Sequence, residues 1–344
     1  MRIIPTIAIL AGILVASCGS PDSSGDPGAG DGQTLTIYSS RHYDSDYALY
    51  EAFEEATGAT VEAIEADGDL LVERISATGG RNPADVIITA DAGRLWRAEQ
   101  ANLFAPVRSD LLDARVPATM RHPDGLWFAI STRARVIVYA EDRVDASELT
   151  GYASLAEPAF RGRVCARSSG NVYNISLLAA LIDRWGSDAA QQWAEGVAAN
   201  FGREPLGGDS DQIRAVAAGE CDVAIVNHYY FARLMGSEPD VTEGLALFWP
   251  NAEQGVHVNI SGMGMSRNAP NPELAQEFLE FAVSDEAQRF FAELTNEYPA
   301  VASVTYENAV LDELGDFEAD PLAATVLGEN QAEAQRLFDR AGWQ

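Results

Sequence analysis

The stretch LWFAISTRARVIVY, Leu126–Tyr139, decides the interpretation of the fold. It contains two apolar runs, Leu126–Ile130 and Val136–Tyr139, around the polar residues 131–133. Runs of this length that are rich in β-branched and aromatic residues are typical of buried strands. One extended segment of this kind can carry the chain from one domain into another. A second extended segment, Gly255–Met263, can bring it back.

Strands and helices alternate on both sides of Leu126–Tyr139. Before it, the pattern predicts strand Leu35–Tyr38, a helix from about Tyr47 to Gly58, strand Thr60–Ile64, helix Leu70–Thr78 and strand Asp85–Thr89. Between the two extended segments it predicts a strand near Arg163–Ala166, helices Ile175–Trp185, Ala189–Ala199 and Asp211–Ala218, and strand Cys221–Val226. After them it predicts mostly helices, over Pro272–Leu294, beyond Val310 and over Ala332–Ala341. This alternation indicates the α/β class, with mostly parallel, doubly wound sheets.

The length of the chain favours two domains. A chain of 344 residues is too long for most single cores, and domains average roughly 150 residues. We predict a first lobe formed by residues 34–132 plus 262–344 and a second lobe formed by residues 133–261, joined by the two extended crossover strands. Ligands of open α/β sheets sit outside the carboxyl ends of the strands, so we expect the functional site in the cleft between the lobes.

The first residues have the plan of an export signal. Met1-Arg2 precedes an uncharged apolar stretch, Ile3–Ala16, which is too short to span a bilayer. The small residues before Cys18 resemble a lipoprotein processing box, in which this cysteine becomes the lipidated first residue. We therefore expect a signal peptide over residues 1–17, a lipidated flexible tether over 18–33, and a periplasmic or cell-surface protein held on the membrane only through this lipid.

The two other cysteines and the charge agree with an exported protein. Cys165 and Cys221 form an even pair in an oxidising compartment, and we expect a disulfide between them if their strands are neighbours. The formal net charge is −29, and the chain has no lysine, so its basic side chains are arginines. Such a surface repels nucleic acid and anionic headgroups, which excludes nucleic acid as a partner.

Tyrosines follow three of the predicted strands. They stand in the segments Ser39–Tyr47, Ser168–Asn174 and Asn227–Tyr230. A single tyrosine at such a place most often caps the sheet as a half-buried aromatic residue, and this is our interpretation of Tyr38 and Tyr139. Four phenols at three strand ends can instead stack on an organic ligand, enclose an amine, or bind a metal ion.

Ferric iron fits these phenols chemically. It is a hard, highly charged cation that prefers anionic oxygen ligands. A free phenol has a pKa near 10 and is protonated at neutral pH, but a bound cation can displace its proton. Three or four phenolates neutralise three positive charges, and they discriminate against divalent ions.

Three runs resemble the ligand loops of the ferric-iron-binding proteins of bacterial ABC importers: Tyr38–Tyr43, Arg167–Asn174 and Val226–Tyr230. The stretches Pro83–Val86, Asp91–Leu95 and Leu327–Gln331 are also similar to that family. The resemblance extends from about residue 34 to residue 344. It implies the two-lobed type II periplasmic-binding fold, a cargo of ferric iron, and a permease as partner of a monomeric binding protein that is not an enzyme.

The resemblance also implies a set of iron ligands. Tyr43, Tyr173, Tyr229 and Tyr230 match ligating tyrosines of the family. His42 matches a histidine that ligates in some members, and a place behind the ligands or in solvent is the alternative for this residue. The tyrosine at position 173 indicates the tyrosine-rich branch, because no obvious site is found for the glutamate ligand of another branch. The resemblance leaves open whether a synergistic anion such as carbonate completes the coordination.

Two other classes of function are weighed against iron binding. No GxSxG, P-loop, HExxH or GxGxxG motif in a suitable context points to an enzyme. A binding protein for a polyamine, thiamine or a phosphonate would use the tyrosines for stacking, and four acidic residues near them keep the amine alternative open: Asp44, Asp46, Asp209 and Asp211. For Arg41, Arg133 and Arg203 we favour surface salt bridges over a place beside the cleft. We expect His228 to face away from the ligands.

Overall fold

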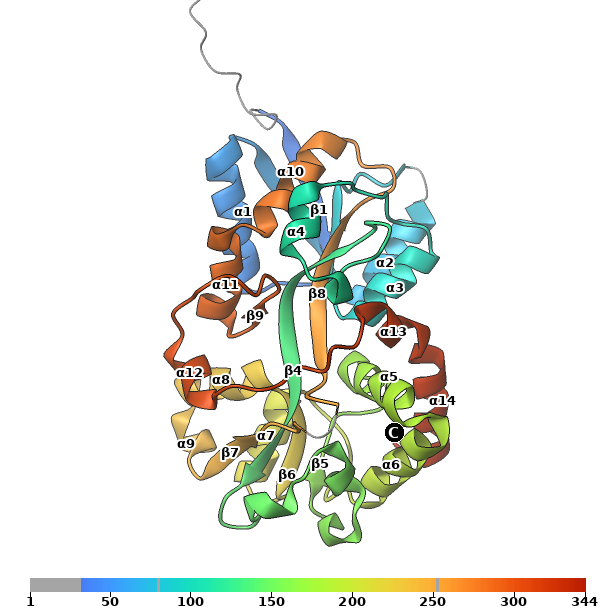
Figure 1. Ribbon diagram of the computed structural model, residues 1–344, viewed down its shortest axis with the longest axis vertical. Coiled ribbons are helices and arrows are strands. Elements are labelled where there is room, and N and C mark those ends of the chain that lie inside the picture. The colour runs from blue at the N-terminus through green and yellow to red at the C-terminus, as the bar shows by residue number, and fades with distance from the viewer. Residues whose placement is uncertain (1–31, 79–80, 252–253) are drawn as a thin grey trace, which may run out of the picture.

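The computed structural model describes residues 32–78, 81–251 and 254–344. The predicted signal peptide and Cys18 lie outside these residues. Figure 1 shows two halves stacked along the long axis, with strands β4 and β8 running between them. Among the described residues, no helix is both long and apolar enough to cross a membrane.

The elements follow the predicted alternation. The chain before the first crossing forms β1 Thr34–Ser39, α1 Asp44–Thr57, β2 Thr60–Glu65, α2 Gly68–Thr78, β3 Val86–Ala90, α3 Ala92–Gln100 and α4 Asp110–Arg115. The middle of the chain forms β5 Val164–Cys165, α5 Val172–Trp185, α6 Ser187–Ala199, α7 Asp209–Ala217, β6 Val223–Asn227, α8 His228–Ser237, α9 Pro239–Thr242 and β7 Leu245–Phe248. The last part forms α10 Pro272–Ala282, α11 Asp285–Thr295, β9 Tyr298–Pro299, α12 Ala309–Leu314, α13 Ala324–Glu329 and α14 Gln331–Ala341.

Two long strands connect the halves, β4 Phe128–Ala140 and β8 Val258–Met265. The first part of β4 pairs antiparallel with β8, and its last part pairs antiparallel with β6 and β7. Strand β8 also pairs antiparallel with β3 of the first half. The order along the sheet is therefore β2-β1-β3-β8-β4-β6-β5. The predicted extended crossings are confirmed. Among the named strands, β1 pairs parallel with β2 and β3, and β5 with β6. The expectation of mostly parallel sheets is wrong, because both crossing strands pair antiparallel with their neighbours.

The helices predicted over Pro272–Leu294 are confirmed as two, with α10 ending at Ala282 and α11 beginning at Asp285. The hydroxyl of Ser284 accepts a hydrogen bond from the backbone N–H of Ala287, which makes this serine the N-cap of α11.

The apolar cores follow the two halves, with two exceptions in the last part of the chain. Leu35, Phe53 and Phe278 belong to the core of the first half, and Ile137 and Trp193 belong to a core of the second half. Helix α14 is predicted in the first lobe with the rest of residues 262–344, but its buried side chains lie in the second core, beside α5 and α6. Leu314 of α12 and Phe317 also pack against a core of the second half. We therefore propose lobe boundaries in which residues 309–317 and 331–344 are counted with the second lobe.

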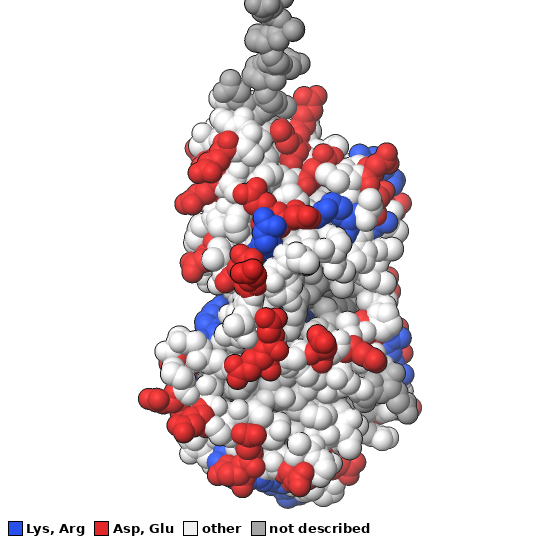
Figure 2. All heavy atoms as spheres, turned by 60° about the vertical axis from the view of Figure 1, so that its left-hand side comes forward, with Lys and Arg blue, Asp and Glu red and all other residues white. Residues whose placement is uncertain are grey.

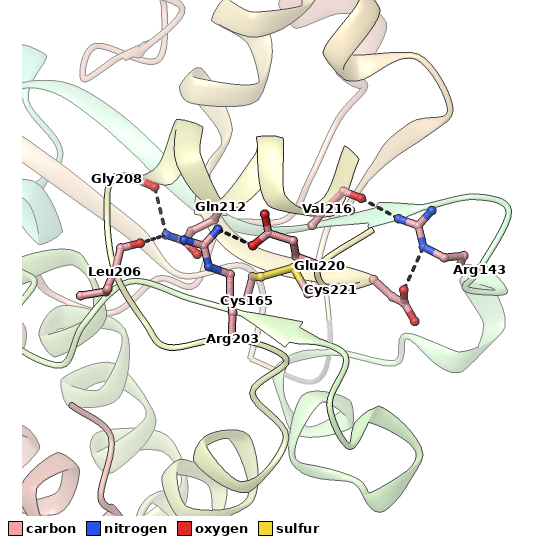
Figure 3. Close-up of a disulfide and its surroundings, with 10 residues drawn as sticks. Arg143, Cys165, Arg203, Leu206, Gly208, Gln212, Val216, Glu220 and Cys221 are labelled. Atoms are coloured by element: carbon pink, nitrogen blue, oxygen red, sulfur yellow. Dashed lines mark hydrogen bonds and ion pairs between the residues drawn. A yellow bond between two sulfur atoms is a disulfide. The ribbon is translucent and has the colours of Figure 1, made fainter. Parts of the chain in front are cut away.

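A disulfide joins Cys165 in β5 to Cys221, two residues before β6, with their Cα atoms 5.8 Å apart. Both cysteines are buried. Figure 3 shows Arg203 and Glu220 beside the disulfide, where their side chains form an ion pair of 3.1 Å. The disulfide links the two neighbouring strands whose carboxyl ends lead to Tyr173 and Tyr229.

Figure 2 shows acidic side chains on both halves of the visible face, with fewer arginines among them. This distribution agrees with the net charge of −29.

Candidate metal-binding site

The four tyrosines of the predicted ligand set lie at the beginnings of three helices. Tyr43 directly precedes α1, and Tyr173 stands in the first turn of α5. Tyr229 and Tyr230 stand in the first turn of α8, where the sequence had suggested a loop. The N-terminus of a helix carries partial positive charge and favours anions, so all three helices favour phenolate at this point.

The structure brings these phenols together. The hydroxyl oxygens of Tyr173 and Tyr229 lie 3.4 Å apart. The ring centroids of Tyr229 and Tyr230 are separated by 4.3 Å, and those of Tyr43 and Tyr229 by 6.5 Å. Tyr43 belongs to the first half of the molecule, whereas the other three tyrosines belong to the second. The cluster therefore spans the boundary between the halves.

The environment keeps Tyr43, Tyr229 and Tyr230 protonated in the absence of a cation. Burial raises the pKa of Tyr229 well above its ordinary value, and the neighbouring phenols Tyr173, Tyr230 and Tyr43 raise it further. Burial is also the main cause of the raised pKa of Tyr43 and of Tyr230, followed in both by Tyr173. Several phenolates so close together would repel one another, so the cluster can ionise only when a cation neutralises them.

A cleft of about 630 Å³ opens beside the cluster and is lined by residues of both halves. Its lining includes His42, Tyr43, Tyr173, Tyr230 and three arginines, Arg94, Arg167 and Arg233. His42 is exposed, and its ring centroid lies 5.5 Å from that of Tyr43. This histidine can therefore reach solutes in the cleft.

Tyr43 rests on a buried ionic network that sequence reasoning missed. The guanidinium carbon of Arg41 lies 4.9 Å from the centroid of the Tyr43 ring. Arg41 donates to Asp46 and to Glu297, each at 2.8 Å, and all three side chains are buried. Burial alone would raise the pKa of Glu297, but the ion pair with Arg41 holds it below its usual value. The prediction of a surface salt bridge for Arg41 is wrong, because its guanidinium is buried against α1, β8 and Glu297.

Three arginines surround the ring of Tyr173. The guanidinium carbons of Arg133, Arg135 and Arg167 lie 5.6, 5.9 and 5.6 Å from its centroid. Arg133 and Arg135 are buried, so the surface salt bridge predicted for Arg133 is also wrong. Both residues stand on β4, in the apolar-flanked stretch that crosses between the halves. The surface pair predicted for Arg203 is confirmed by its contact with Glu220.

Arg233 is a further residue that the sequence analysis did not select. Its guanidinium carbon lies 5.8 Å from the ring centroids of Tyr43 and Tyr229 and 5.6 Å from that of Tyr230. Helix α8 begins at His228, so Arg233 stands one turn after Tyr229 and Tyr230 on the same helix. Recognising that helix would have revealed the arginine, which can offset the charge of phenolates.

Three of the four acidic residues considered for an amine site are paired with arginines, and the fourth, Asp44, is exposed at the start of α1. Asp46 pairs with Arg41, and Asp209 pairs with Arg135 at 2.7 Å. Asp211 pairs with Arg214 at 3.2 Å. Within residues 32–78, 81–251 and 254–344, no group of three or more His, Cys, Asp and Glu side chains is arranged to hold a metal ion. Two carboxylates, Glu65 and Asp67, also line the cleft, where Glu65 accepts a hydrogen bond from the hydroxyl of Tyr47 and Asp67 from the backbone N–H of Asp69. The phenols are the anionic oxygen donors that converge on one point.

His228 faces away from the cluster, as predicted. Its Nδ1 accepts a hydrogen bond from the backbone N–H of Ala134 at 3.1 Å, so Nε2 carries the proton and donates to the carbonyl of Asn296 at 2.8 Å. Burial is the main cause that lowers the pKa of His228 to about 4. Both ring nitrogens are occupied, which leaves none for a metal.

The comparisons with known proteins point in one direction. Residues 81–316 match the family model described as bacterial extracellular solute-binding protein. The chain is 48% identical over 319 residues to the iron uptake protein A2 of Synechocystis sp. (strain ATCC 27184 / PCC 6803 / Kazusa), covering 91% of this chain and 90% of that protein. The Trichodesmium protein IdiA (FutA) in complex with iron and citrate ligands has a TM-score of 0.86 and 47% identity, covering 90% of this chain and 100% of that one.

A ferric binding protein from Campylobacter jejuni has a TM-score of 0.85 and 36% identity, again over 90% of this chain and 100% of that one. These similarities extend over the two halves and the crossing strands. They confirm the predicted two-lobed type II periplasmic-binding fold.

Proposed function

The chain belongs to the family of bacterial extracellular solute-binding proteins, and we propose that it captures ferric iron between its lobes and delivers it to the permease of an ABC importer. The observation that supports this most strongly is the convergence of four phenols from three helix N-termini, with hydroxyl oxygens 3.4 Å apart at Tyr173 and Tyr229. The relatives named for iron uptake and ferric binding support the same cargo.

Tyr43, Tyr173, Tyr229 and Tyr230 are the proposed ligands. Ferric iron displaces the phenolic protons, and four phenolates outweigh its three positive charges. Arg233, stacked against the rings of Tyr43, Tyr229 and Tyr230, offsets the surplus negative charge. Because Tyr43 comes from the first lobe and the others from the second, iron bridges the lobes and favours their closed arrangement.

The remaining coordination is assigned to His42 and an anion. His42 lines the same cleft as three of the tyrosines, which supports a place as fifth donor. The arginines Arg94, Arg167 and Arg233 line this cleft as well, and they suit a small anion such as carbonate.

An organic amine fits this cleft less well than iron. A polyamine or thiamine would need free carboxylates beside the tyrosines, but Asp46, Asp209 and Asp211 are paired with arginines. Asp44 is exposed, and Glu65 in the cleft already accepts a hydrogen bond from the hydroxyl of Tyr47. The arginines of the cleft would suit a phosphonate, but binding of a phosphonate would not explain why four phenols converge there. We assign no catalytic role to the chain.

The remaining features describe the setting of this function. We propose export through residues 1–17, a lipid on Cys18 as the only membrane anchor, and action as a monomer in the periplasm or at the cell surface. In that oxidising setting the disulfide between Cys165 and Cys221 forms.

Titration of the purified protein with ferric citrate tests the proposal. Phenolate coordination to ferric iron is expected to give a strong visible absorption band and to release protons into a weakly buffered solution. Tyr230→Phe should weaken the band. Tyr139→Phe is the matched control, because Tyr139 lies in the second lobe at the distal end of β4. A colourless mixture without acidification would reject iron binding by these tyrosines.

A further inference from the structure

Asp91 is a buried carboxylate at the boundary between the lobes. It directly follows β3 and is the N-cap of α3, where its Oδ1 accepts a hydrogen bond from the backbone N–H of Gly93 at 2.8 Å. Its backbone has a φ of 94°, in a region that L-residues rarely adopt. Such a conformation persists only where the surroundings determine it, and it is often associated with function.

The second oxygen of this carboxylate reaches outside its own lobe. Oδ2 of Asp91 accepts hydrogen bonds from the hydroxyl of Ser176 at 2.8 Å and from the side-chain amide of Asn259 at 2.7 Å. Ser176 lies on α5, three residues after Tyr173, and Asn259 lies on the crossing strand β8. One carboxylate thus contacts the first lobe, the crossing strand and the helix that presents a proposed iron ligand.

The side chain of Asn259 makes further hydrogen bonds through its carbonyl oxygen. Its side-chain carbonyl accepts from the backbone N–H groups of Ala92 at 3.0 Å and Ile260 at 2.8 Å. Asp91 and Asn259 therefore form a pair at the point where β8 enters the first lobe. Of the donors to the Asp91 carboxylate, Gly93 lies on α3 and Asn259 on the crossing strand, whereas Ser176 lies on α5 in the body of the second lobe. Both Asp91 and Ser176 are fully buried, so water does not compete for this contact.

We propose that the contact between Asp91 and Ser176 is a latch for the closed state, which positions Tyr173 opposite Tyr43 and slows the release of ferric iron. This inference rests on the proposed function. Asp91 acts through α5 as a positioning residue and does not touch the metal. Because a helix is rigid over one turn, fixing Ser176 also fixes the direction from which the Tyr173 hydroxyl approaches the cleft.

The test compares Ser176→Ala with Ser154→Ala. Ser154 is also a buried serine of the second lobe, but its hydroxyl donates to the carbonyl of Gly151 within the same lobe. Each protein is loaded with ferric citrate, and the dissociation rate of iron into excess EDTA is measured. Ser176→Ala is expected to release iron about tenfold faster than wild type, which corresponds to ~1.4 kcal/mol. The position of the visible band should not change, because the ligands are the same.

Two readouts separate the latch from a structural role. The apo forms of the two variants should lose similar stability in urea, whereas only Ser176→Ala should accelerate release. Asp91→Asn, which keeps the volume of the side chain, should accelerate release at least as much. Equal release rates for Ser176→Ala and Ser154→Ala would reject the latch while leaving iron binding intact. A wild-type protein that takes up no iron would reject the proposed function and the latch with it.

Discussion

The two lobes contribute to the phenol cluster in different ways. The second lobe supplies three tyrosines that contact one another, with the hydroxyl oxygens of Tyr173 and Tyr229 3.4 Å apart. The first lobe supplies one tyrosine, Tyr43, which stacks on the buried Arg41. In the proposed binding mode, the second lobe holds most of the metal site by itself, and the first lobe completes the site on closure. This difference predicts that substitutions in the two lobes have different consequences.

The largest effect is expected from breaking the support of the first lobe. Glu297→Ala leaves the buried Arg41 with Asp46 as its remaining acidic partner, and removing one member of a buried ion pair costs about 3–5 kcal/mol. The free energy of unfolding of the apo-protein, measured by urea denaturation, should fall by about this amount. Asp211→Ala is the control, because Asp211 pairs with Arg214 on the surface. Equal losses in both variants would contradict a special role of the network.

Acid should weaken the apo-protein through His228. Its pKa is lowered from 6.5 to about 4, so its contribution to stability is present above pH 6.5 and is lost as the pH falls toward 4. Each pKa unit corresponds to 1.36 kcal/mol, so the contribution lost is roughly 3 kcal/mol.

His228→Gln should remove this part of the pH dependence, because the amide can accept from Ala134 and donate to Asn296 without titrating. Urea denaturation from pH 7 to pH 4 measures the difference between wild type and variant. A constant difference over this range would show that His228 does not titrate as described.

Removing one phenol from each lobe tests whether the two lobes contribute differently to iron binding. Tyr229→Phe removes the central hydroxyl of the second lobe. Since loss of a residue behind a metal ligand typically costs 10–100-fold in affinity, loss of a ligand should cost more than about 100-fold. Tyr43→Phe should also weaken binding, but it should leave a coloured complex on the second lobe. Citrate competition measures the affinity, and small-angle scattering measures closure. A fully closed iron complex of Tyr43→Phe would contradict the division of roles.

The smallest effect is expected at His42. This side chain is exposed, so solvent can replace it as a donor. His42→Ala should weaken ferric iron binding by at most about tenfold, or ~1.4 kcal/mol. His122→Ala is the control, since His122 pairs with Glu99 outside the cleft. A loss as large as that of Tyr229→Phe would place His42 among the principal ligands.

The parts of the fold that depend on local pattern were predictable. Leu126–Tyr139 is apolar over a long extended segment, and this pattern correctly predicted the crossing strand β4. The tyrosines were found because each follows a strand, and carboxyl ends of strands meet at one edge.

Other features depend on contacts between distant residues. Glu297 has no local signal, because its role comes from meeting Arg41 across the fold. Arg133 looked like a surface residue because an arginine is rarely buried without partners, and its neighbours come from β8 and α5. The apolar face of α14 was visible as a pattern, but periodicity does not tell which of two cores it joins.

The position of α14 has a consequence for how the lobes move. Besides β4 and β8, the last part of the chain passes between the lobes repeatedly, from α12 beside the second lobe to α13, which contacts α3 of the first, and then to α14 on the second lobe. Two adjacent crossing strands alone would let the lobes twist as well as bend relative to each other. Additional connections at the side of the molecule resist the twisting motion. The lobes are therefore expected to open and close by bending about a single axis. Tyr43 would then return to the same position relative to the other three tyrosines each time iron is bound and released.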